Sequence, residues 1–141
     1  MRLTVTLGLC ACATVGSAQL KHYAGTYEFI RIVQGKPLNN KTLPVNQVMR
    51  LELHAEGNWV MRNMLIGYDG SWHMSGRKLV LLTANGPNGK IKVPDKLILV
   101  PKPDRNRLVP ESPRRMVGSC EFRYAPKLMA ELAKRVKDLA K

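Results

Sequence analysis

Residues 49–83 read MRLELHAEGNWVMRNMLIGYDGSWHMSGRKLVLLT, and this stretch decides the fold class. Apolar and polar residues alternate from Met49 to Ala55, which is the period of a strand with one buried face. A Glu-Gly-Asn turn follows at 56–58, and the returning segment is expected to direct Trp59, Met61 and Leu65 toward the core.

Two further turn signals extend this pattern. Asp69-Gly70 predicts a second turn, after which Trp72 and Met74 alternate with polar residues. Ser75-Gly76-Arg77 then leads into the Leu/Val-rich run at 78–83. Short turns between apolar runs indicate hairpins, and hairpins require antiparallel pairing.

The flanking segments add strands and one helix. The other strand candidates are Gly25–Val33, Lys96–Val100, Arg107–Val109 and Gly118–Tyr124. Prolines border the two middle candidates and predict short or edge strands. From Pro126 the apolar spacing becomes helical, so an amphipathic helix over about 126–140 is expected to pack on the strands. We therefore predict a mainly β protein: an antiparallel meander barrel of about eight strands with one C-terminal α-helix.

The N-terminus predicts export. Arg2 precedes an uncharged, mostly apolar run, and Gly16 and Ala18 place small side chains where signal peptidase requires them. We expect residues 1–18 to be a signal peptide cut between Ala18 and Gln19. Residues 19–141 would then form a single secreted or periplasmic domain.

The cysteines fit this prediction and also suggest an alternative. Cys10 and Cys12 lie in the expected signal, which leaves Cys120 as the only thiol of the mature chain and excludes an internal disulfide. Cys120 alternates with Phe122 and Tyr124 and is expected to be buried. Residues 9–12 loosely resemble a lipobox, so a lipid anchor on Cys12 is the alternative localisation.

The chain is strongly basic, with a formal net charge of +13. Residues 19–100 and 101–141 each contain 11 Lys/Arg and 5 Asp/Glu, so there is no basic arm of the kind that binds nucleic acid. The positive charge makes an acidic polymer or an anionic membrane surface the alternative partner. A nucleic acid is not expected as one.

Three segments resemble the small bacterial secreted lipocalin-like domains. Gly25-Thr26-Tyr27 stands where that family has Gly-x-Trp, and Glu56-Gly57-Asn58-Trp59 resembles its polar-Gly-polar-aromatic hairpin. The stretch from Gly70-Ser71-Trp72 to Leu81 resembles its Gly-x-Trp, turn, Leu-x-Leu segment. The resemblance covers about residues 25–82 and implies a barrel and an exported protein. The resemblance does not decide between ligand binding and enzyme inhibition, since related barrels include enzyme inhibitors.

Large aromatic side chains are the candidate ligand-binding residues. If the barrel interior holds a ligand, Tyr27, Trp59, Trp72 and Phe122 are expected to line it, although a small barrel also needs such residues as filling. We expect a mostly filled interior with at most a shallow pocket at one mouth.

No catalytic or metal site is expected. Asp69, Ser71 and His73 alternate along one strand without an oxyanion loop, and no histidine or cysteine pair has zinc spacing. The sequence therefore predicts a non-enzymatic binding protein without a cofactor, whose partner is a small apolar ligand or a protein. The alternatives are a barrel-type inhibitor of a secreted hydrolase and a basic domain that binds acidic polymers or membranes.

Overall fold

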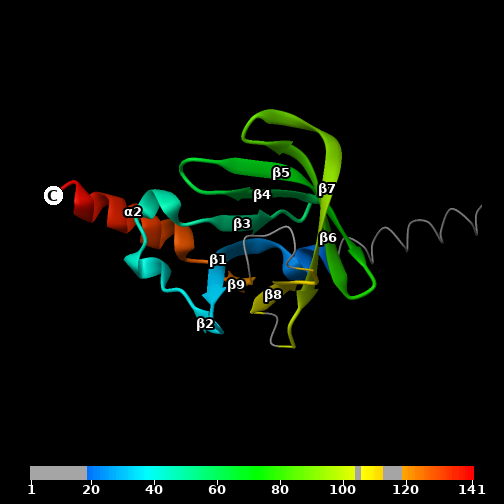
Figure 1. The fold of residues 1–141 in the computed structure, drawn as a ribbon, viewed down its shortest axis with the longest axis horizontal. Helices are drawn as coiled ribbons and strands as arrows, with labels where there is room; N and C mark the ends of the chain where they lie inside the picture. The colour runs from blue at the N-terminus through cyan, green and yellow to red at the C-terminus, as the bar shows by residue number, and fades with distance from the viewer. Residues whose placement is uncertain (1–18, 104–105, 113–118) are drawn as a thin grey trace, which may run out of the picture.

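Antiparallel strands make up most of the chain. The computed structural model describes residues 19–103, 106–112 and 119–141, with no side-chain description for 91–94. The signal peptide predicted for 1–18 therefore lies outside the described residues. Figure 1 shows a strongly curved sheet, with a helix that projects from one end of the molecule.

Eight of the described strands close into a barrel. Each barrel strand pairs with the next barrel strand along the chain, and the first barrel strand also pairs with the last, which closes the ring. All of these pairings are antiparallel, so the predicted meander barrel is confirmed. The eight strands are β1 (Gly25–Val33), β3 (Arg50–Leu53), β4 (Asn58–Arg62), β5 (Gly67–Ser75), β6 (Lys78–Gly86), β7 (Gly89–Pro101), β8 (Arg107–Pro110) and β9 (Cys120–Tyr124). A two-residue strand, β2 (Lys36–Pro37), pairs with the end of β1.

Inward-facing side chains form one apolar core. Its buried members come from every barrel strand: Tyr27, Leu51, Leu53, Trp59, Met61, Trp72, Leu79, Leu81, Leu99, Leu108 and Phe122. Both tryptophans are 2 % exposed, and both indole N–H groups have a partner. Trp59 donates to the Leu82 carbonyl at 3.1 Å, and Trp72 donates to the His54 carbonyl at 2.9 Å. These bonds remove the penalty of burying an unpaired indole N–H.

The turn predicted at Asp69-Gly70 is wrong. Asp69-Gly70 was expected to form a turn, but both residues lie inside β5, where the pairing with β6 shifts register between them. A Cβ atom on Gly70 would lie 1.8 Å from the Leu82 carbonyl oxygen and 3.0 Å from Nε1 of Trp59. Glycine is therefore required here for a close approach of strands and not for a turn.

Leu65 corrects a second prediction. It was expected to face the core, but β4 ends at Arg62, and Leu65 is 66 % exposed in the turn between β4 and β5. The Asn63 side chain accepts backbone N–H bonds from Leu65 and Ile66, which stabilises this turn. Tyr124 is also more exposed than expected at 39 %, although its ring contacts that of Tyr27.

The C-terminal helix packs on the barrel only through its first turns. Helix α2 (Leu128–Leu139) follows β9, with Leu128 buried, Leu132 half-buried, and Met129, Val136 and Leu139 exposed. It contacts β1 and the 3-10 helix η2 (Val45–Gln47). Arg135 of α2 also donates to the carbonyls of residues 40, 41 and 43 in and after the 3-10 helix η1 (Asn40–Thr42). Within the described residues, no helix combines the length and apolar character needed to cross a membrane.

Candidate functional site

A cavity of about 410 Å³ opens at one end of the barrel. Its lining comes from the second half of β1, the residue before β3, β4 and the turn after it, the start of β5, the second half of β6 and the middle of β7, which antiparallel pairing places side by side. The lining residues are Phe29, Arg31, Met49, Trp59, Met61, Ile66, Tyr68, Thr83, Asp95, Lys96 and Leu97. Buried side chains therefore fill one part of the barrel and leave the other part hollow.

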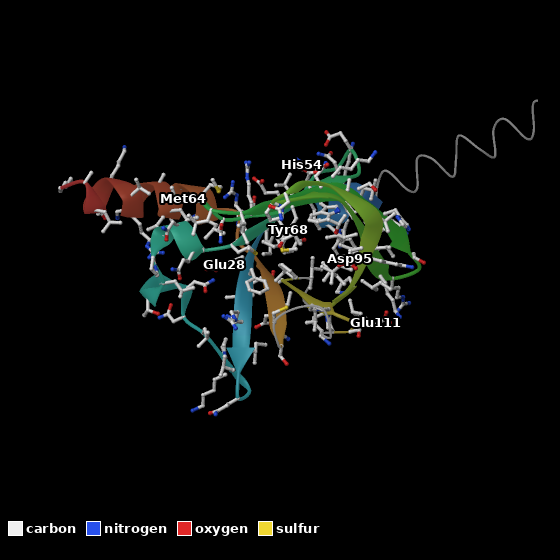
Figure 2. The ribbon with its side chains drawn as sticks, turned by 45° about the horizontal axis from the view of Figure 1, so that its top comes forward. Glu28, His54, Met64, Tyr68, Asp95 and Glu111 are labelled. Carbon is white, nitrogen blue, oxygen red and sulfur yellow. The ribbon has the colours of Figure 1, made fainter. Side chains whose placement is uncertain are left out.

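The walls of this cavity are mostly apolar. Aromatic rings come from Phe29, Trp59 and Tyr68, while Met49 and Met61 contribute unbranched, polarizable side chains that adapt to irregular ligands. Figure 2 shows Tyr68 on the inner side of the curved sheet. A concave, largely apolar surface with few polar groups is typical of a site for a small ligand.

The polar part of the lining carries charge. Arg31 and Lys96 are exposed, and Asp95, labelled in Figure 2, is half-buried. Two cations and one carboxylate leave this part of the lining with a net positive charge. The site can therefore bury an apolar body while the charged residues contact a polar group.

The four predicted ligand-binding residues separate into two groups. Trp59 lines the cavity, whereas Tyr27, Trp72 and Phe122 are buried in the packed core. Tyr27 donates its hydroxyl hydrogen to the Tyr23 carbonyl at 2.8 Å, and the ring of Phe122 contacts that of Phe29. The structure thus brings Trp59 together with residues that sequence reasoning did not select.

Three residues that line the cavity are not among the predicted ligand-binding residues: Met49, Tyr68 and Leu97. The alternation from Met49 predicts a core residue there, and the turn signal at Asp69-Gly70 predicts no inward-facing role for the neighbouring Tyr68. Leu97 belongs to a strand that was expected to be short. Inward alternation within β5 and β7 was the available signal, since Tyr68 and Leu97 share the inward register of Trp72 and Leu99.

A second hollow of about 720 Å³ lies at the opposite end of the barrel. Its lining comes from the helical residues 19–23, the β5–β6 turn and the segment after β7. Gln19, the expected first residue of the mature chain, is exposed here, while Ala18 lies outside the described residues. This lining mixes cationic, polar and apolar groups.

Reactive groups do not converge within the described residues. Asp69, Ser71 and His73 are all exposed on the outer face of β5, and Asp69 accepts a hydrogen bond from Asn85 at 2.8 Å. No group of three His, Cys, Asp or Glu residues in the described ranges could hold a metal ion.

Cys120 is a buried thiol on the inner face of β9. Burial and, to a smaller extent, the neighbouring Glu121 carboxylate raise the pKa of the Cys120 thiol to about 11. Glu121 points to the opposite face of the strand, where Arg123 holds it at 2.8 Å. A thiol with a raised pKa is a weak nucleophile at neutral pH.

The chain matches no protein-family model, and comparisons with curated proteins and with solved structures find no match.

Proposed function

We propose that this protein is an exported, non-enzymatic binding protein of lipocalin-like type that takes one small apolar ligand into the cavity beside Trp59. The observation that supports the proposal is the cavity itself, about 410 Å³ in a closed eight-stranded barrel. Ligand sites for small molecules commonly have volumes of roughly 300 to 1,000 Å³. Barrels of eight strands have an interior of the size that holds one such ligand.

The lining favours a ligand with an apolar body and one polar or anionic end. Phe29, Met61 and Leu97 offer apolar contact, while Arg31 and Lys96 supply positive charge at the exposed part of the site. A charge-assisted hydrogen bond to an exposed cation adds orientation, and apolar burial supplies most of the affinity. Saturated fatty acids and retinol are therefore suitable probes.

The test is a titration of the mature protein with a homologous series of fatty acids, with retinol and with haem, followed by tryptophan emission. A saturable change at micromolar concentration is expected, because Trp59 lines the cavity. Saturation at a hundredfold excess over Kd should also stabilise the fold by about 2.7 kcal/mol.

Two substitutions on β7 give a matched comparison. Leu97→Arg places a guanidinium group in the cavity wall, whereas Val100→Arg places the same group on the other face of the strand. Leu97→Arg should weaken binding at least about tenfold and Val100→Arg should leave it unchanged. An absence of saturable binding to every probe, or equal binding by both variants, would contradict the proposal.

A further inference from the structure

An exposed apolar surface lies beside the cavity end of the barrel. Its first part is the β4–β5 turn, where the consecutive residues Met64, Leu65 and Ile66 are 66 %, 66 % and 40 % exposed. Three consecutive exposed apolar residues at a hairpin tip are unusual in a soluble domain unless the tip has a partner. The flanking residues Arg62, Asn63 and Gly67 add no negative charge.

The second part is the uncovered side of α2. Met129, Val136 and Leu139 are 44 %, 44 % and 77 % exposed, and their spacing of seven and three residues places them along one side of the helix. Lys134, Lys137 and Lys141, spaced three and four residues apart, lie along another side and are all exposed. This is the arrangement of an amphipathic helix that binds a membrane interface.

The hairpin tip and the helix are neighbours. The backbone N–H of Met64 donates to the Asn46 carbonyl in η2 at 3.3 Å, and α2 contacts η2 as well. Figure 2 shows Met64 beside α2, and in Figure 1 the β4–β5 turn and the helix lie at the same end of the molecule. Together they offer apolar side chains with a cationic surround: residues 126–141 contain five Lys/Arg and two Asp/Glu.

We infer that the β4–β5 turn and α2 form a docking surface for an anionic phospholipid bilayer. The apolar tip enters the interface between headgroups and acyl chains, and the helix lysines contact lipid phosphates. Charge complementarity selects this occupant, because a helix that exposes apolar residues along one side and lysines along another matches a negatively charged lipid surface. Ile66 also lines the cavity, so docking brings the cavity next to the bilayer.

The test is co-sedimentation of the mature protein with vesicles of phosphatidylcholine alone and of phosphatidylcholine with phosphatidylglycerol. Binding to the anionic vesicles, its loss at high salt and at least about tenfold weaker binding to neutral vesicles are expected. M64S/L65S should weaken binding at least about tenfold, whereas V33S/L38S, which removes exposed apolar residues elsewhere, should not. K134Q/K137Q/K141Q should also weaken it, unlike K21Q/K78Q/K102Q near the opposite end of the barrel.

Neither Met64 nor Leu65 lines the cavity, so ligand titration of M64S/L65S keeps this inference separate from the proposed function. Unchanged ligand binding together with lost vesicle binding supports the docking surface. Failure to bind anionic vesicles, equal binding to neutral ones, or dimerisation of the wild-type protein that M64S/L65S abolishes would each overturn it.

Discussion

Gly70→Ala is expected to destabilise the barrel far more than an ordinary glycine substitution. The added Cβ would lie 1.8 Å from the Leu82 carbonyl oxygen and 2.9 Å from its carbonyl carbon. Both atoms belong to the backbone of β6, so β5 and β6 must separate for the methyl group to fit. That separation also breaks the bond from Trp59 Nε1 to Leu82.

The magnitude follows from these two losses. Overpacking of a tight site costs about 1 to 3 kcal/mol, and leaving a buried indole N–H or carbonyl unpaired costs about 1 to 3 kcal/mol more. The expected loss is therefore about 3 kcal/mol of unfolding free energy. With a urea m-value of roughly 1 to 3 kcal/mol/M, the midpoint should fall by about 1 to 3 M.

The assay is urea unfolding followed by tryptophan emission, with Gly67→Ala as the matched control in the same strand. A Cβ on Gly67 meets only the Cβ of Arg62 at 3.3 Å, so its cost should stay below about 1 kcal/mol. Combining Gly70→Ala with Trp59→Phe should cost less than the sum, since both changes remove the same hydrogen bond. A Gly70→Ala protein within about 1 kcal/mol of wild type would refute this reasoning.

Three further predictions concern the thiol, the helix and the N-terminus. The pKa of about 11 at Cys120 leaves about a hundredfold less thiolate at pH 8 than the ordinary value of 9.0. Thiol labelling of the folded mature protein should therefore be at least about a hundredfold slower than labelling after denaturation, and fast labelling would contradict the burial of Cys120. Arg135→Met removes the three bonds to the 40–43 segment and should speed amide hydrogen exchange in α2 about tenfold, with Lys134→Met as the control; equal exchange in both would show that Arg135 does not anchor the helix. Mass spectrometry of the exported protein should find an N-terminus at Gln19 or within a residue or two, and a retained Met1 or a lipid on Cys12 would contradict the predicted signal.

The sequence predicted the strands well where alternation and turn chemistry agreed. The predicted strand Gly25–Val33 has the same bounds as β1, and Trp59, Met61 and Trp72 are buried as expected. The prediction failed at Asp69-Gly70, because a turn-forming dipeptide also suits a place where two strands approach closely. It also failed at β7, which extends to Gly89–Pro101 and includes a proline position where the pairing with β6 is irregular.

The cavity was harder to predict than the strands. Phe29, Met61 and Leu97 are far apart in the chain and share a wall only because three strands converge at one barrel end. Alternation predicts that each of these side chains points inward. It does not predict at which height of the barrel the inward side chains fill the interior and at which height they leave a cavity. That distinction depends on the combined volumes of residues from every strand.

The most direct test of ligand binding uses the methyl groups of the methionines. Met49 and Met61 line the cavity, whereas Met74 and Met129 lie outside its lining. In NMR spectra of the mature protein with labelled methionine methyl groups, a saturating fatty acid should shift the Met49 and Met61 signals and leave those of Met74 and Met129 in place. Shifts confined to Met74 or Met129, or no shift at all, would contradict a ligand site in the cavity beside Trp59.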